Sequence, residues 1–217
     1  MYSSEVYYKP TFDNIPGEKR KKILDVAINE FANRGFENAN INTIAKKAEV
    51  SVGSLYKYFD TKTDLFMTCI SYGIGYIESI LKSVTSSDED VMIKLEKLVR
   101  ITIEYSRKYG VLVKLYNQFT SESDPERAIK LARKMESITA SCYKKVIEEG
   151  QLSGEIRQDI DCGMAAFMVD NILMNLQFSY ACDYYRERYR IFVGEDVFGK
   201  DDMIVDNILR FVKASLK

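Results

Sequence analysis

The chain has 217 residues, 46% of them hydrophobic and 29% charged, with a formal net charge of -1, so it is long enough to bury the core of one or two domains and is not a basic polyelectrolyte. It has 0 His, and its 4 Cys are far apart, which excludes zinc sites and Ser-His or Cys-His catalysis in their usual forms. Because a nucleotide-binding glycine loop and a nucleophile elbow are also absent, the sequence predicts a protein that is not an enzyme and that uses no cofactor and no metal.

The N-terminal residues and the lengths of the apolar runs indicate in which cellular compartment the protein is expected. Residues 1–10 read MYSSEVYYKP and lack the charged and apolar segments of a signal peptide. No apolar run approaches the ~20 residues that cross a membrane. We therefore expect a cytoplasmic protein with no membrane partner, whose Cys side chains are buried reduced thiols, with redox sensing as the alternative.

A low content of helix breakers indicates an all-α protein of about nine helices. The sequence has 3 Pro and 11 Gly, and its apolar residues recur at helical spacing. Residues 1–15 are polar and rich in Tyr, and we expect a flexible arm there. The first helix is predicted from Glu18 to Arg34, where Gly35 favours a left-handed stop. The run KRKK at residues 19–22 is either a solvated helix start or a set of phosphate contacts.

Residues 38–65 predict two short helices, a tight turn and the start of a third helix. Asn40 caps the first, Ser51 the second and Thr61 the third. Asp64 follows Thr61 by three residues, as in a carboxylate variant of the capping box. Helices this short are unstable alone because nucleation is costly. The pattern therefore predicts a helix-turn-helix, which docks on a core and places a recognition helix in the major groove of DNA.

The stretch INTIAKKAEVSVGSLYKYFDTKTDLF, residues 41–66, resembles the DNA-binding segment of the TetR family of bacterial transcription regulators. The preceding helix also fits, because Ile23, Ala27, Phe31 and Gly35 stand in the family's order. Glu49 departs from the pattern, since the family usually has Gly at this position in the turn. A left-handed conformation at Glu49 would cost roughly 1–2 kcal/mol, unless the turn is reshaped.

The resemblance implies how the chain is divided. A flexible arm at residues 1–15 is followed by a three-helix helix-turn-helix DNA-binding domain at residues 16–60. Residues 61–217 form a larger helical domain for ligand binding and dimerisation.

The apolar periodicity predicts six helices in this larger domain. They are expected at Thr61–Ser83, Val91–Lys108, Val111–Phe119, Pro125–Glu149, Asp161 through Phe178, and Asp201–Leu216. The fifth of them either ends there or continues through the charged stretch Asp183–Arg190. Gly73 and Gly75 interrupt the first of them, either for close packing or as a soft point between the domains. The last two are apolar on more than one face and must be buried on nearly all sides. Either they fill the centre of a monomer or, as the resemblance implies, they form a four-helix bundle in a homodimer.

Nine residues of the motif are expected to contact DNA. Val52, Gly53 and Ser54, at the start of the recognition helix, should face base edges. Lys57 should reach a guanine or a phosphate. The other five are assigned to phosphates, three of them through their counterparts in the family and two through their place near a helix start; they are Tyr56, Tyr58, Lys62, Asn42 and Thr43.

Aromatic residues are plentiful in the larger domain and predict an apolar cavity for a flat or flexible ligand. Asp170, Asn171 and Asn175 interrupt an apolar helix and need partners. They either orient a ligand or form hydrogen bonds across the dimer. The candidate ligand contacts are Tyr72, Tyr76, Tyr105, Tyr109, Tyr116, Phe119, Phe167, Asn171, Asn175 and Phe178.

These expectations combine into one predicted function. The chain is expected to be a TetR-type transcription regulator, most simply a repressor, which binds a palindromic double-stranded DNA operator as a homodimer. A small apolar or aromatic effector would release it. The alternative is a DNA-binding regulator that a protein partner controls; an open cavity would favour the ligand, and a filled core the partner.

Overall fold

Eleven α-helices and one 3-10 helix make up this computed structural model, which describes residues 6–120 and 124–217 apart from the side chains of Tyr76 and Phe119. That part of the chain contains no strand, so the predicted all-α class is confirmed. None of its helices is both long enough and apolar enough to cross a membrane. The elements are α1 (Pro10–Asp13), α2 (Gly17–Asn38), α3 (Ile41–Lys47), α4 (Val52–Tyr58), α5 (Lys62–Thr85), α6 (Val91–Lys108), α7 (Gly110–Phe119), α8 (Pro125–Ser153), α9 (Cys162–Ala181), α10 (Asp183–Val193), η1 (Glu195–Gly199) and α11 (Asp201–Leu216).

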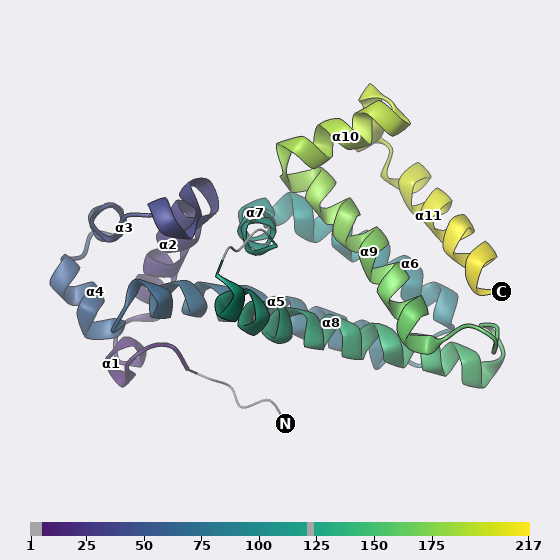
Figure 1. Cartoon of the computed structure of the whole chain (residues 1–217), viewed down its shortest axis with the longest axis horizontal. Coiled ribbons are helices and arrows are strands. Elements are labelled where there is room, and N and C mark those ends of the chain that lie inside the picture. Colours follow the sequence, from purple (N-terminus) through teal and green to yellow (C-terminus); the bar gives the residue numbers. More distant parts are fainter. Residues whose placement is uncertain (1–5, 121–123) are drawn as a thin grey trace.

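A small group of helices lies at one end of the molecule and a larger group at the other (Figure 1). Helices α1 to α4, which we call the headpiece, hold α3 and α4 at the outer edge. Helices α5 and α8 pack against each other and run from the headpiece along the molecule. Helix α9 packs on α6, α7 and α8, and α10 and α11 complete the far end. We call α5 to α11 the regulatory half.

Large aromatic side chains fill the core of the headpiece. Phe31 of α2, Phe59 after α4 and Phe66 of α5 are fully buried. The rings of Phe31 and Phe66 meet edge to face, with their centroids 4.9 Å apart. The same core continues into α7 through Leu115 and into α8 through Leu131. Helix α5 therefore contributes to the packing of both halves.

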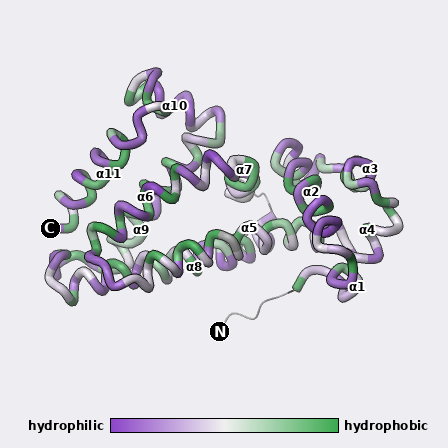
Figure 2. The backbone as a smooth tube through the Cα atoms, turned by 180° about the vertical axis from the view of Figure 1, so that it is seen from behind, coloured by the Kyte–Doolittle hydropathy of each residue, from purple (hydrophilic) through white to green (hydrophobic). Residues whose placement is uncertain are grey.

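Helix α9 is apolar on two sides, and only one of them is covered within this chain. Leu173 and Leu176 are buried in the core of the regulatory half. Met164, Phe167 and Met168 are exposed on the other side. Helix α11, along which apolar and polar residues alternate (Figure 2), also exposes apolar side chains.

The helix plan differs from the sequence prediction at four places. Helix α2 continues past its predicted end at Arg34 to Asn38, with a kink at Gly35, where φ is 71°. Residues 10–13 of the expected arm form α1, which packs on the headpiece because Phe12 is buried against Phe59 at a centroid distance of 4.9 Å. Helix α8 continues to Ser153, past the predicted end. Helix α9 ends at Ala181 because Cys182 is extended, with φ -110° and ψ 130°, and α10 is a separate helix.

Candidate DNA interface and ligand cavity

The three predicted N-caps of the helix-turn-helix are present. The Asn40 side chain accepts a hydrogen bond from the Asn42 amide at 2.8 Å, and Ser51 Oγ accepts one from the Ser54 amide at 3.0 Å. Thr61 and Asp64 form the reciprocal capping box, with distances of 3.1 Å and 2.9 Å. Each cap satisfies amide groups that a helix start leaves free. Residues close in the sequence therefore fix the N-terminal ends of α3, α4 and α5.

The turn between α3 and α4 keeps the left-handed geometry in spite of its residue. Glu49 has φ 58° and is the one non-glycine residue with positive φ in the described part of the chain. Its carboxylate pairs with Lys22 Nζ at 2.7 Å, and this hydrogen bond lowers the pKa of Glu49. The turn is therefore not reshaped, and Glu49 carries the strain that glycine would avoid.

Most of the predicted DNA contacts face solvent at least in part. Asn42, Gly53, Tyr56 and Lys57 are exposed, and Thr43, Val52, Ser54 and Lys62 are partly buried.

Tyr58 is the exception among the nine. Its side chain is only 8% exposed, and its ring lies 5.6 Å from that of Phe12. The structure therefore places the Tyr58 ring in the core of the headpiece, and the phosphate contact expected of this residue stays a prediction. The aromatic residue of α1 covers it, and that helix was not expected.

Lys62 is partly turned away from a free surface. Its Nζ donates a hydrogen bond to the Glu37 carbonyl oxygen at 3.0 Å and lies 4.9 Å from the centre of the Phe36 ring. The carboxylate of Asp64 already occupies the start of α5, where free helix amides would otherwise favour a phosphate. Lys62 would have to exchange its contact with Glu37 for one with DNA.

The segment around α1 holds the C-terminal end of α4. The Lys9 amide donates to the Tyr58 carbonyl at 2.7 Å, and Lys9 Nζ donates to the Tyr56 carbonyl at 3.1 Å. The Thr11 hydroxyl donates to the Lys57 carbonyl. These donors satisfy carbonyl groups that a helix end leaves free, and the Lys9 cation suits the negative end of the helix dipole. This role was not predicted from the sequence, because the contacts join residues that lie 46 to 49 positions apart.

Exposed lysines supply positive charge around the two short helices. Helix α3 ends in Lys46 and Lys47, and α4 carries Lys57 in its last turn. Although the net charge of the chain is -1, binding to phosphates depends on such a local surface.

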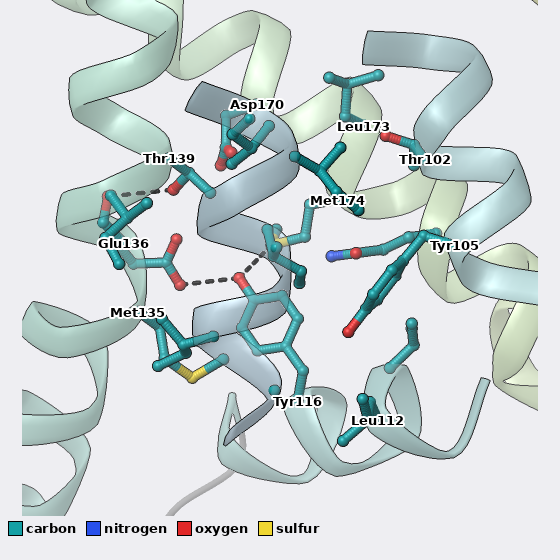
Figure 3. Close-up of a pocket in the computed structure, with 18 of the residues that line it drawn as sticks. Thr102, Tyr105, Leu112, Tyr116, Met135, Glu136, Thr139, Asp170, Leu173 and Met174 are labelled. Carbon is teal, nitrogen blue, oxygen red and sulfur yellow. Dashed lines mark hydrogen bonds between the residues drawn. The ribbon is translucent and has the colours of Figure 1, made fainter. Parts of the chain in front are cut away.

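A cavity of about 120 Å³ lies in the regulatory half, where residues from α5, α6, α7, α8 and α9 surround it (Figure 3). Its walls are mostly aliphatic, and include Ile77, Leu98 and Leu173. Each helix turns an apolar stripe towards the others, and the side chains do not fill the space between them. Gly73 lines the cavity beside Leu112, since a Cβ on Gly73 would lie 3.4 Å from Leu112 Cδ2.

Two carboxyl groups line this apolar cavity. Glu136 Oε1 accepts a hydrogen bond from the Tyr116 hydroxyl at 2.8 Å. Burial, and then the charge of Glu136, raises the pKa of Asp170 to about 6. Burial and Glu136 also raise the pKa of Tyr116, so its hydroxyl remains a donor. Figure 3 shows Glu136, Thr139 and Asp170 on one side of the pocket and Tyr105 on the other.

The cavity contains only part of the predicted ligand site. Tyr105 and Tyr116 line it. The side chains of Tyr76 and Phe119 lie outside the described part of the structure. The lining does not include Tyr72, Tyr109, Phe167, Asn171, Asn175 or Phe178.

These six residues have other surroundings. Phe178 is buried beside Tyr116, with ring centroids 5.3 Å apart, in a separate aromatic cluster. Phe167 is 62% exposed on the outer side of α9. The side-chain amides of Asn171 and Asn175 donate to carbonyl groups one turn earlier in their own helix.

The two tyrosines of this group lie outside the cavity for different reasons. Tyr72 is 46% exposed on the surface of α5. The ring of Tyr109 lies 5.0 Å from that of Tyr105, which is itself part of the cavity wall.

Glu136 was not among the predicted site residues, and Asp170 was expected either to orient a ligand or to form a hydrogen bond across the dimer. A helical stripe in α8 contains Glu136, Thr139, Tyr143 and Val146, which recur at intervals of three and four residues. Tyr143 and Val146 are buried, and the first three of the stripe line the cavity. This spacing could have identified Glu136 as a site residue, because a charged residue on the buried face of a helix must face a cavity or a partner.

Comparison with known proteins matches the helix-turn-helix first. The family model described as "Bacterial regulatory proteins, tetR family" matches residues 23–68. Over 198 residues the chain is 23% identical to the "Probable acrEF/envCD operon repressor" of Escherichia coli strain K12, which covers 88% of this chain and 85% of that protein.

Solved structures share the whole fold. A TetR family transcriptional regulator from Chloroflexus aurantiacus matches with a TM-score of 0.71 and 22% identity, over 96% of this chain and 98% of that one. The transcriptional regulator FadR from Bacillus subtilis, solved in complex with stearoyl-CoA, matches with a TM-score of 0.72 and 17% identity, over 87% and 97% of the two chains.

Proposed function

Because this chain belongs to the TetR family of bacterial regulatory proteins, we propose that it is a transcription repressor that binds a palindromic operator as a homodimer and leaves it when a small ligand binds. The observation that carries the proposal is the capped helix-turn-helix α3–α4, which stands at the outer edge of the molecule (Figure 1).

The proposed contacts with DNA follow from exposure and chemistry. Val52, Gly53 and Ser54 form the first turn of α4 and read base edges. Lys57 contacts a guanine or a phosphate, and Tyr56 a phosphate. Asn42, Thr43 and Lys62 complete the phosphate contacts, with Lys62 changing its present partner.

The proposed dimer uses the uncovered sides of α9 and α11. Met164, Phe167 and Met168 on α9 and Phe211 on α11 are all exposed. Exposed large apolar side chains gathered on a helix mark an interface, and a two-fold axis would place two recognition helices on half-sites about 34–36 Å apart. The division proposed for the chain keeps residues 16–60 as the DNA-binding domain and residues 61–217 as the domain for ligand and dimer.

An open cavity supports control by a ligand over control by a protein partner. Protein interiors are normally close-packed, and here the surrounding side chains leave part of the interior unfilled. Its volume of about 120 Å³ is close to that of an engineered cavity of about 150 Å³ that holds benzene. The proposed ligand is therefore small, with an apolar or aromatic body. The stearoyl chain in the complex of the Bacillus subtilis neighbour would exceed this space.

Selection of binding sites from a random DNA pool tests the proposed function. We expect a palindrome to be recovered, a dimer to be found by light scattering, and affinity to fall steeply with salt. Lys57→Ala should lower the salt slope by about one, whereas Lys145→Ala, an exposed lysine on α8, should leave it unchanged. A monomer that binds DNA without salt dependence would contradict the proposal.

A further inference from the structure

The cavity combines a small apolar volume with charges of one sign. Its lining in the described part of the chain includes Glu136 and Asp170 but no Lys and no Arg. The polar groups that accompany them are hydroxyls and one amide, from Thr102, Thr139, Tyr105, Tyr116, Tyr143 and Gln177. A ligand inside this cavity therefore meets negative charge and hydroxyl dipoles, and it meets no cation.

The two carboxyl groups come from different helices and approach the same space. Glu136 is on α8 and Asp170 on α9, two helices that pack together. Glu136 accepts a hydrogen bond from the Tyr116 hydroxyl at 2.8 Å, and this neutral partner does not compensate the charge of the carboxylate. The pKa of Asp170 is raised by burial and by Glu136, whereas a cation at close range would act in the opposite direction.

In addition to the two carboxyl groups, aromatic side chains in the walls of the cavity favour a cation. The side chains of Tyr105, Tyr116 and Tyr143 all line the space, and the face of an aromatic ring attracts a cation within about 6 Å. An anionic head group would instead be repelled by both carboxylates in a poorly hydrated site. A neutral ligand would fill the volume and leave the two charges as they are.

Resting on the proposed function, we infer that the effector is a small lipophilic ammonium ion whose apolar body fills the cavity and whose nitrogen lies between Glu136 and Asp170. The volume limits the body to about one aromatic ring or a short alkyl chain. Because its two carboxylate partners belong to α8 and α9, the bound cation draws these helices together, and α9 is the helix that the proposed dimer uses.

Probes matched in shape and different in charge test this inference. The first set is 2-phenylethylamine, 2-phenylethanol and phenylacetate, and the second is hexylamine, hexanol and hexanoate. Each is titrated at pH 7.5 into the full chain, with the melting temperature and the dissociation constant for the selected operator as readouts. We expect at least one amine to bind at least tenfold more tightly than its alcohol and to weaken operator binding, and neither carboxylate to bind.

Variants locate the charge. Glu136→Gln and Asp170→Asn should each remove most of the preference for the amine while the alcohol binds as before. Glu148→Gln, at an exposed position on the same helix α8, should keep the preference. Unchanged operator affinity in the absence of ligand shows that each variant is folded.

The outcomes separate the inference from the function on which it rests. If no amine in either set binds better than its alcohol, or if both cavity variants keep the preference, the inference is wrong. Operator binding that an alcohol releases as well as an amine would leave the proposed repressor intact and overturn only the charge of the effector.

Discussion

Ile44 in the headpiece is completely buried, whereas Ile77 in the regulatory half borders a cavity of about 120 Å³. Both are isoleucines on amphipathic helices, and their surroundings differ in how completely they are packed. In the headpiece the caps, the turn and the aromatic core leave little freedom, which suits the proposed docking of α4 on DNA. In the regulatory half part of the core is left open and carries charge, which suits the proposed binding of a ligand. Four predictions test this difference, from the largest expected effect to the smallest.

Truncation of the same residue type in the two halves gives the largest effect. Ile44→Ala should lower the free energy of unfolding by about 3–5 kcal/mol, because it opens a cavity in a filled core. Ile77→Ala should cost about half as much, since its side chain already borders empty space and loses fewer contacts. Urea unfolding of both variants measures the difference. Equal losses would show that the cavity is filled in solution.

The two glycines of α5 test how the halves communicate. A Cβ would lie 3.4 Å from Leu112 at Gly73 and would meet no atom within 4 Å at Gly75, so both sites have room for alanine. Gly73→Ala with Gly75→Ala should raise the free energy of unfolding by about 2 kcal/mol through helix propensity. The double variant should keep its affinity for the operator in the absence of ligand.

The stiffened helix should nevertheless reduce the ligand's effect on operator affinity, which is the measured coupling. Gly75→Ala alone is the control, because it changes propensity without adding an atom to the cavity wall. If coupling is unchanged in the folded double variant, the glycines do not act as a hinge.

Asp170 should make the regulatory half sensitive to pH. Its pKa is raised from 3.8 to about 6, so between these values the folded state binds more protons than the unfolded state, and stability must fall as pH rises. Asp170→Asn should remove this loss. After allowance for its partial exposure, the variant should be about 1 kcal/mol more stable at pH 7.

The same variant should have nearly the stability of the wild type below pH 4, where the wild-type carboxyl group is protonated. Urea unfolding at pH 4, 5, 6 and 7 measures the trend. A gap between the two proteins that stays constant with pH would assign the effect to packing and not to charge.

The turn of the headpiece gives the smallest expected effect. Glu49→Gly should raise the free energy of unfolding by about 1 kcal/mol, because glycine adopts positive φ without strain. Part of the gain is offset by loss of the exposed ion pair with Lys22. Lys22→Ala removes this pair while leaving the strain, and should be neutral or slightly destabilising. A loss of stability in Glu49→Gly would mean that the ion pair outweighs the strain.

The headpiece was predictable from short-range signals. Asn40, Ser51 and Thr61 cap the helices that follow them, and Gly35 has φ 71° where the first helix was expected to stop. These features depend on residues within four positions of each other, so the local sequence contains the whole interaction. The buried position of Tyr58 was not predictable in this way, because it depends on Phe12, 46 positions earlier.

The all-α class, the helix-turn-helix and the family were determined by the sequence itself, through helical periodicity, caps and a motif of fixed spacing. The cavity was decided only by the tertiary structure. Five helices surround it with residues from Cys69 to Gln177, and its volume is the space that their side chains jointly fail to fill. On α9, which carries apolar residues on more than one face, periodicity does not show which side turns inward. Packing against α6, α7 and α8 placed Asp170 in the cavity and left Phe167 outside.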